Sequence, residues 1–107
     1  MNNPRYDIKW AGRCTFDTSD KIWGWFLYND PTSITTKHPV AYAFWARTGT
    51  TANFKKHVYN SWAMDKLVRD KKDRKYTEIS TNELLTIWPS FYDDIDNRFI
   101  FFLLVGD

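Results

Sequence analysis

Hydrophobic and polar residues alternate along residues 40–47, which predicts a β-strand with two different faces. One face carries Val40, Tyr42, Phe44 and Ala46, and the other carries Ala41, Ala43, Trp45 and Arg47. A glycine-containing turn at residues 48–51 follows, and residues 53–59 alternate again. In that second segment Phe54, Lys56 and Val58 share one side, and the other side holds Lys55, His57 and Tyr59. Strand, turn and strand predict a β-hairpin.

Three further segments favour strands. Residues 6–16 alternate loosely, with a break expected near Gly12, and residues 21–28 are rich in residues that favour strands. Residues 29–39, with two prolines and three threonines, are expected to form a loop. Residues 98–105 are apolar on both faces, which predicts a strand in the centre of a sheet.

Helical periodicity begins after the hairpin. Asn60 and Ser61 can cap a helix start, and the apolar residues that follow fall within about 140° of arc: Ala63, Met64, Leu67 and Val68. This helix is expected to end near Lys72, because the next cations would rotate onto its apolar face. Ser80 and Glu83 form a capping-box pattern for a short second helix, and residues 91–97 are expected to add another helical turn.

These elements predict an α+β fold, a small antiparallel sheet of four to five strands with one principal helix packed on one face. A single domain is expected over residues 1–107, because no repeat or linker divides the chain. The 43% hydrophobic content suffices for a core, and the lone Cys14 leaves packing, not a disulfide, to stabilise it. A polar N-terminus and the absence of a long apolar run predict a soluble, cytoplasmic protein with no membrane partner.

Charge is distributed unevenly although the net charge is only +2. Residues 37–76 hold ten basic and three acidic residues, whereas the rest of the chain holds five basic and ten acidic ones. Clustered Lys and Arg residues are typical of surfaces that bind phosphate backbones, although charge runs also occur on ordinary solvated faces.

The predicted hairpin contains Trp45, Arg47 and Gly49 in the run W-A-R-T-G. An aromatic strand precedes this run. A second strand and a helix follow it, with Ala63, Leu67, Lys71 or Lys72, and then Tyr76 in the motif places. In this order and spacing, residues 21–79 resemble the WGR domain family, whose signature is a strand ending in W-G-R-x-G, a second strand and a helix. Two positions depart from the family, because Ala46 and Lys75 stand where it usually has glycine. Residues 80–107 form an extension outside the resemblance.

The resemblance implies a WGR-like fold and DNA binding without catalysis. The family is best known as a module of poly(ADP-ribose) polymerases that grips DNA near strand breaks, and it also occurs in short bacterial proteins. There the motif Trp packs against nucleic acid and the motif Arg makes polar or interdomain contacts. By position these roles fall to Trp45 and Arg47. The ADP-ribosylating domain is absent from a chain of this length.

Physical reasoning from the residues predicts the same surface. If the outer faces of the two hairpin strands coincide, an aromatic platform lies among cations, where it can stack on sugars or bases while Lys and Arg neutralise phosphates. The predicted nucleic-acid-binding residues are Trp45, Arg47, Lys55, Lys56, His57, Tyr59, Lys71, Lys72, Arg74 and Lys75. Two alternatives stay open: Trp45 is equally a candidate core residue, and Arg47 a candidate structural ion pair.

Motifs for catalysis and cofactors are missing from the sequence. Cys14, His38 and His57 are scattered without metal-ligand spacing, so neither a zinc site nor a Cys/His pair is expected. No glycine-rich phosphate-binding motif occurs, and Asp93, Asp94 and Asp96 lack the spacing of a calcium loop. We therefore expect no enzyme, no cofactor and no metal.

Two functions follow from this sequence. The first is a nucleic-acid-binding module, with DNA favoured over RNA, that recognises backbone and ends in preference to base sequence. The alternative is a protein-interaction module, such as a phage-type inhibitor docking on a host nucleic-acid-processing enzyme. The acidic and apolar residues 78–107 favour this alternative.

Overall fold

The computed structural model describes residues 6–28, 40–48, 53–57 and 59–97. It has an α+β fold with an antiparallel sheet of five strands in the order β4-β3-β2-β1-β5. The elements along the chain are β1 (Tyr6–Cys14), a 3-10 turn (Phe16–Thr18), β2 (Lys21–Tyr28), β3 (Val40–Arg47), β4 (Asn53–His57), α1 (Ser61–Asp73), β5 (Thr77–Glu78) and α2 (Thr81–Ile87). Residues 91–97 are also helical.

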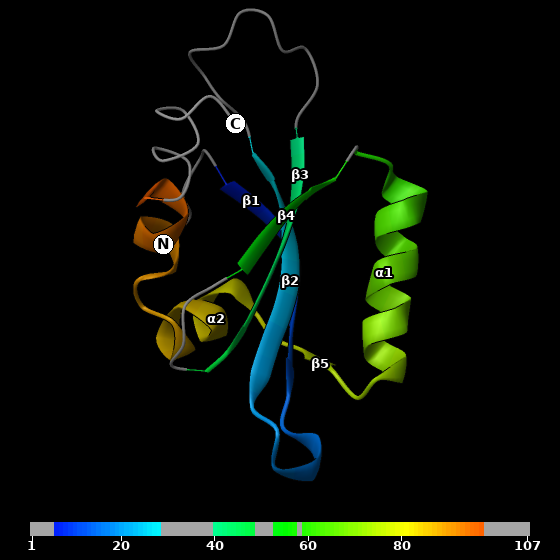
Figure 1. Ribbon diagram of the computed structural model, residues 1–107, viewed down its shortest axis with the longest axis vertical. Coiled ribbons are helices and arrows are strands. Elements are labelled where there is room, and N and C mark those ends of the chain that lie inside the picture. The colour runs from blue at the N-terminus through cyan, green and yellow to red at the C-terminus, as the bar shows by residue number, and fades with distance from the viewer. Residues whose placement is uncertain (1–5, 29–39, 49–52, 58, 98–107) are drawn as a thin grey trace, which may run out of the picture.

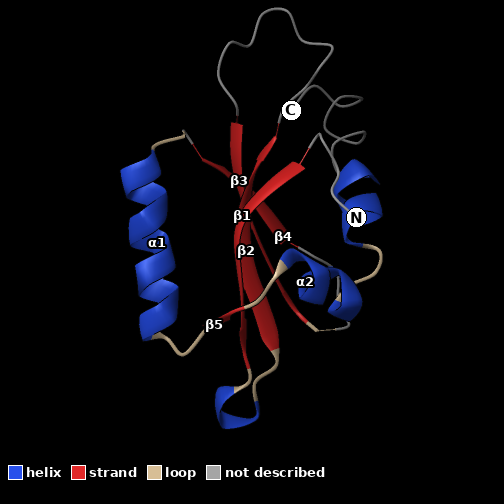
Figure 2. Ribbon diagram, turned by 180° about the vertical axis from the view of Figure 1, so that it is seen from behind, coloured by secondary structure: helices blue, strands red, loops and turns tan. Residues whose placement is uncertain are grey.

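Helices cover both sides of the sheet. Figure 1 shows α1 on one side of the strands and α2 with helical residues 91–97 on the other, and Figure 2 shows the same layers from behind. We call these sides the α1 face and the α2 face. The principal helix on one face was predicted, and the described C-terminal helices form a second layer on the opposite face.

Strands β2 and β3 have the predicted bounds and pair antiparallel over their full length, from Lys21 with Arg47 to Tyr28 with Val40. Strand β4 is described over Asn53–His57, within the expected range of 53–59; residue 58 lies outside the described residues, and Tyr59 is not part of the strand. The expected loop at residues 29–39, most of the turn at 48–51 and the expected strand at 98–105 lie outside the described residues.

The break expected near Gly12 was placed wrongly. Strand β1 pairs continuously with β2 through Gly12, and its register shifts between Ile8 and Trp10. A Cβ at position 12 would lie 2.3 Å from Cη2 of Trp10, so the glycine makes room for the indole and does not break the strand. Strand β1 ends at Cys14, because the backbone of Thr15, with φ −115° and ψ 14°, is no longer extended.

Helix α1 begins where its cap was predicted. The side chain of Asn60 accepts a hydrogen bond from the backbone N–H of Ala63 at 3.2 Å. The helix ends at Asp73, one residue beyond the expected end, and Lys75 follows with a φ of 74°. Left-handed backbone at this place lets the N–H of Tyr76 bond back to the carbonyl of Lys71 at 3.0 Å, which closes the helix end.

The sheet separates two hydrophobic clusters. The cluster on the α2 face is centred on Phe26, Phe44 and Phe91, all fully buried. The cluster on the α1 face contains Trp10, Trp23, Trp25, Leu27, Ala41, Ala43, Met64 and Val68. Alternation along β3 therefore separates neighbouring side chains between two environments.

Candidate nucleic-acid interface

The register of the hairpin places four of the predicted binding residues on one face. In an antiparallel pair, residues opposite each other point to the same side of the sheet. Lys55 lies opposite Ala43 and His57 opposite Ala41, and both alanines belong to the cluster on the α1 face. Alternation puts Trp45 and Arg47 on that same face.

Lys56 lies on the other side of the sheet. It pairs with Tyr42, which belongs to the cluster on the α2 face. Residues 55 and 56 are both exposed lysines, yet β-strand alternation points them to opposite faces. Of the ten predicted residues, Lys56 is therefore separated from the surface formed by Trp45, Lys55 and His57.

A cleft of about 390 Å³ opens on this surface, between the end of β3 and the segment after α1. Its lining residues are Lys21, Ile22, Trp45, Ala46, Arg47, Asn53 and Tyr76. The Trp45 side chain is 38% exposed, so it is partly buried and partly open to solvent. Two aromatic side chains and two cationic ones thus share one concave surface.

Lys71 extends the cationic part of the cleft from the last turn of α1. Its Nζ lies 5.5 Å from the ring centre of Trp23 and 5.7 Å from that of Tyr76, within the range of cation–π attraction. Burial lowers the pKa of Lys71, and the charges of Arg74 and Lys21 lower it further. The Asp70 carboxylate acts in the opposite direction, and an anion bound beside Lys71 would likewise favour its charged form.

The other basic residues at the end of α1 lie at the edge of the cleft. Lys72, Arg74 and Lys75 are exposed at the helix end, and Arg74 Nε forms an ion pair with the Asp70 carboxylate at 3.4 Å. Cys14 Sγ contacts the backbone carbonyl of Arg74 at 3.8 Å, which links this helix end to β1. These cations border the cleft and do not line it.

His57 and Tyr59 contribute aromatic surface. Burial, and then the charge of Lys55, lower the pKa of His57 from its ordinary value of 6.5. His57 is therefore mostly neutral at pH 7 and adds no cation there. Tyr59 is 40% exposed, and its ring centre lies 6.2 Å from that of Trp25.

Sequence reasoning missed Lys21 and Tyr76 as site residues. Lys21 lies opposite Arg47, but this pairing crosses the long segment between β2 and β3, which carries no signal for register. Trp62 was missed as well: it is 66% exposed, and Lys66 Nζ lies 5.8 Å from its ring centre. The helical periodicity could have found it, because residues four apart share a helix face.

Neither a metal-binding group nor a membrane-spanning helix occurs among the described residues. Within it, no group of three or more His, Cys, Asp or Glu side chains is placed to hold a metal ion. No helix among the described residues is both long and apolar enough to span a membrane.

No protein-family model, no curated protein and no solved structure matches this chain. The resemblance of residues 21–79 to the WGR family therefore stays a prediction. The cations and aromatic rings of the cleft therefore carry the proposal of function.

Proposed function

We propose that this chain is a non-catalytic nucleic-acid-binding module, and that it holds the phosphate backbone on the α1 face. The observation that carries the proposal is the cleft where Lys21 and Arg47 flank Trp45 and Tyr76, with the ammonium of Lys71 beside it. Lysine and arginine neutralise phosphates, and an exposed aromatic ring stacks on a base or sugar. We propose DNA and not RNA as the ligand because residues 21–79 resemble the WGR family, which binds DNA.

Backbone recognition suits this surface better than base recognition. Helix α1 buries Met64 and Val68 against the sheet, and its solvent side mixes the acids Asp65 and Asp70 with its cations. Such a helix carries carboxylates that phosphates repel, so it is poorly suited to lie in a major groove. Affinity should then depend on charge and on the shape of the nucleic acid, with little dependence on sequence.

Fluorescence anisotropy with labelled duplex, nicked and single-stranded DNA, and with RNA of the same sequence, tests the proposal. If about three phosphates are neutralised, the logarithm of affinity falls with a slope of about −2.7 against the logarithm of salt concentration. That slope corresponds to roughly a forty-fold loss of affinity between 50 and 200 mM salt. Absence of binding to every substrate at low salt would refute the proposal.

Lys55 and Lys56 provide a matched pair of variants. Each of Lys55→Gln and Lys56→Gln removes one exposed positive charge, but the two side chains lie on opposite faces. Lys55→Gln should weaken binding and reduce the salt slope by about 1, whereas Lys56→Gln should leave the slope unchanged. Equal effects of both variants would mean that net charge, and not the α1 face, determines binding.

A protein-interaction module is the second candidate. Trp62 favours it, because a tryptophan that is 66% exposed in the first turn of a helix resembles the aromatic anchors of protein interfaces. In this case Trp62→Ser should abolish the capture of one dominant protein partner, while the chain retains no DNA. Of residues 78–107, which prompted this candidate, residues 98–107 lie outside the described part.

A further inference from the structure

A second cavity lies between the end of β3 and the C-terminal helices, and it shares Ile22, Ala46 and Arg47 with the cleft. It encloses about 240 Å³ and is lined by Ile22, Ala46, Arg47, Thr48, Ile87, Trp88, Pro89, Ser90 and Asp94. This volume is smaller than the roughly 300–1,000 Å³ of pockets that hold whole drug-sized ligands. The cavity therefore suits a group about as large as one side chain.

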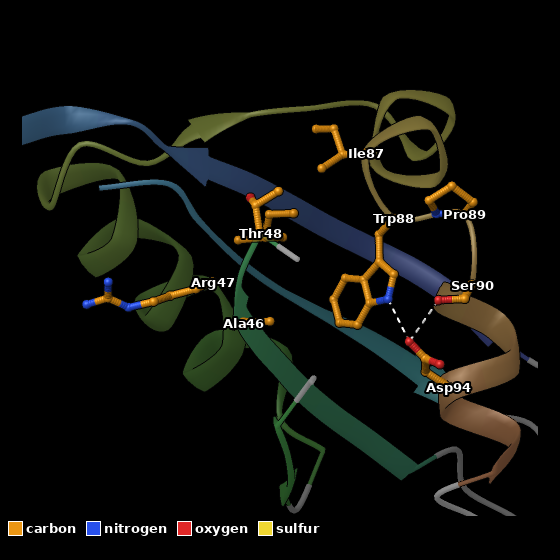
Figure 3. A pocket seen from close by; sticks show the side chains of 9 residues that line it. Ala46, Arg47, Thr48, Ile87, Trp88, Pro89, Ser90 and Asp94 are labelled. Carbon is orange, nitrogen blue, oxygen red and sulfur yellow. Dashed lines mark hydrogen bonds between the residues drawn. The ribbon is translucent and has the colours of Figure 1, made fainter. Parts of the chain in front are cut away.

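The carboxylate of Asp94 is held at the edge of this cavity by two donors. Trp88 Nε1 donates to Asp94 Oδ2 at 2.7 Å, and the Ser90 hydroxyl donates to the same oxygen at 3.1 Å (Figure 3). No hydrogen bond to the other oxygen, Oδ1, occurs within the described residues. Asp94 is thus fixed in orientation while one oxygen keeps its capacity to accept hydrogen bonds.

Apolar side chains form another part of the wall. Ile22, Ala46, Ile87 and Pro89 line it together with the Trp88 side chain. Figure 3 shows the side chain of Arg47 extending away from Trp88 and Asp94, so this arginine does not fill the cavity. Apolar walls beside an indole and a fixed carboxylate complement a flat cation on an aliphatic chain.

A second carboxylate lies behind the rim. The Thr48 hydroxyl donates to Asp20 Oδ1 at 2.9 Å, and Asp20 also binds the Arg13 guanidinium at 2.9 and 3.0 Å. Arg13 holds the pKa of Asp20 below its ordinary value of 3.8, so Asp20 is charged at neutral pH. Arg13 offsets the charge of Asp20, so Asp94 is the carboxylate in the wall that favours a positive ligand over a negative one.

We propose that this cavity binds an alkyl guanidinium group, the side chain of an arginine. The guanidinium donates to Asp94 Oδ1 and lies against the Trp88 ring, while the aliphatic stem contacts Ile22, Ile87 and Pro89. Guanidinium is preferred over ammonium because its flat, weakly hydrated fork fits both a carboxylate and an indole. The cavity and the cleft share Ile22, Ala46 and Arg47, but Asp94 and Trp88, which would hold the guanidinium, do not line the cleft.

Titration of ¹⁵N-labelled protein with N-acetyl-arginine amide tests this site. Trp88 Nε1–H bonds directly to Asp94, so its NMR signal should shift saturably, and Trp88→Phe assigns that signal among those of the six tryptophans. The neutral isostere N-acetyl-citrulline amide should bind at least ten-fold more weakly. Equal binding of the two compounds, or no saturable shift, would overturn the proposal.

Asp94→Asn and Asp93→Asn form the matched pair for the carboxylate. Both remove one negative charge from adjacent residues, but Asp93 does not line the cavity. Asp94→Asn should weaken binding at least ten-fold and Asp93→Asn less than two-fold. If Asp94→Asn does not fold, Thr48→Leu at an exposed lining position narrows the cavity and should weaken binding instead. Unchanged affinity in the folded variant would refute the site.

Binding of free arginine distinguishes two sources of the guanidinium group, an arginine side chain in a polypeptide and the free amino acid. If the site serves arginine within a polypeptide, free arginine should bind more weakly than the blocked compound. The reason is that the α-carboxylate of free arginine would lie near the Asp20 and Asp94 carboxylates. Tighter binding of free arginine would assign the same pocket to the amino acid itself. Both results support a guanidinium site, and binding of neither compound would overturn it.

Discussion

The two faces of the sheet have aromatic cores but differ in the helices and charges that surround them. On the α1 face, helix α1 contributes two buried residues, Met64 and Val68. On the α2 face, Leu84, Phe91 and Ile95 from the C-terminal helices are all fully buried. The lighter cover leaves the outer part of β3 and β4 partly exposed on the α1 face.

Charge also differs between the two pockets, although Arg47 lines both of them. The cleft on the α1 face is lined by cations beside aromatic rings, whereas the cavity on the α2 face has the Asp94 carboxylate at its edge. On the α2 face, carboxylates accept hydrogen bonds from aromatic side chains, as Asp94 does from Trp88 and Asp96 from Tyr6. We therefore expect core substitutions on the α2 face to lower stability most, and we propose the α1 face as the one that binds anions.

The largest effect is expected for Phe44→Ala, in the core of the α2 face. Phe44 is fully buried, and its ring centre lies 4.8 Å from that of Phe91. Truncation should lower the free energy of unfolding by about 3–5 kcal/mol, measured by urea denaturation. Phe44→Leu, which keeps most of the volume, should lose less than half as much. A loss below about 1 kcal/mol for Phe44→Ala would contradict the assignment of stability to this face.

Trp45→Ala changes the next residue, on the opposite face. It should weaken nucleic-acid binding by about 1–3 kcal/mol through lost stacking, and anisotropy titration measures this change. The free energy of unfolding should fall less than for Phe44→Ala, because Trp45 is 38% exposed. Trp45→Phe retains an aromatic ring and should keep most of the affinity. Greater destabilisation by Trp45→Ala than by Phe44→Ala would reverse the comparison.

Lys75→Gly tests the helix end that borders the cleft. The φ of Lys75 is 74°, where a side chain costs about 1 kcal/mol that glycine avoids. The variant should therefore raise the free energy of unfolding by about 1 kcal/mol in urea denaturation. Lys72→Gly, inside α1, should lower it by a similar amount. Destabilisation by both variants would show that the Lys75 side chain contributes more than its backbone conformation costs.

The smallest effect concerns the pH dependence of stability on the α1 face. The pKa of His57 is lower in the folded chain than its ordinary value of 6.5, so the unfolded chain binds a proton first as pH falls. The free energy of unfolding should therefore decrease as pH falls below about 6.5, and His57→Gln should reduce this slope between pH 6.5 and 5. Urea denaturation across this range provides the measurement, and a steeper slope in the variant would contradict the prediction.

Local patterns predicted most of the described elements. Strands β2 and β3, the Asn60 cap and the start of α2 followed from periodicity and capping, because these depend on neighbouring residues. Strand β5 was not predicted, since Thr77–Glu78 is too short to show alternation and forms by pairing with β1. The prediction of a break at Gly12 was wrong. The glycine is needed there because a side chain would clash with the Trp10 ring, and the backbone continues as a strand.

The candidate site could be predicted only in part. Alternation placed Trp45 and Lys55 on one face and already separated Lys56 from Lys55, although all three were grouped in one site. Lys21 and Tyr76 could not be found, because their place beside Trp45 depends on register and on where α1 ends over the sheet. No pattern in the sequence indicated the cavity at Asp94.

The sequence by itself determined the strands, the principal helix and the alternation that gives β3 two different faces, because each depends on interactions between near neighbours. Only the tertiary structure decided which face became the anion-binding candidate. Helix α1 packs over the tryptophans of β1 and β2 and leaves Trp45 partly exposed, while the C-terminal helices bury Phe44. That choice rests on contacts between segments distant in the chain, which no local pattern records.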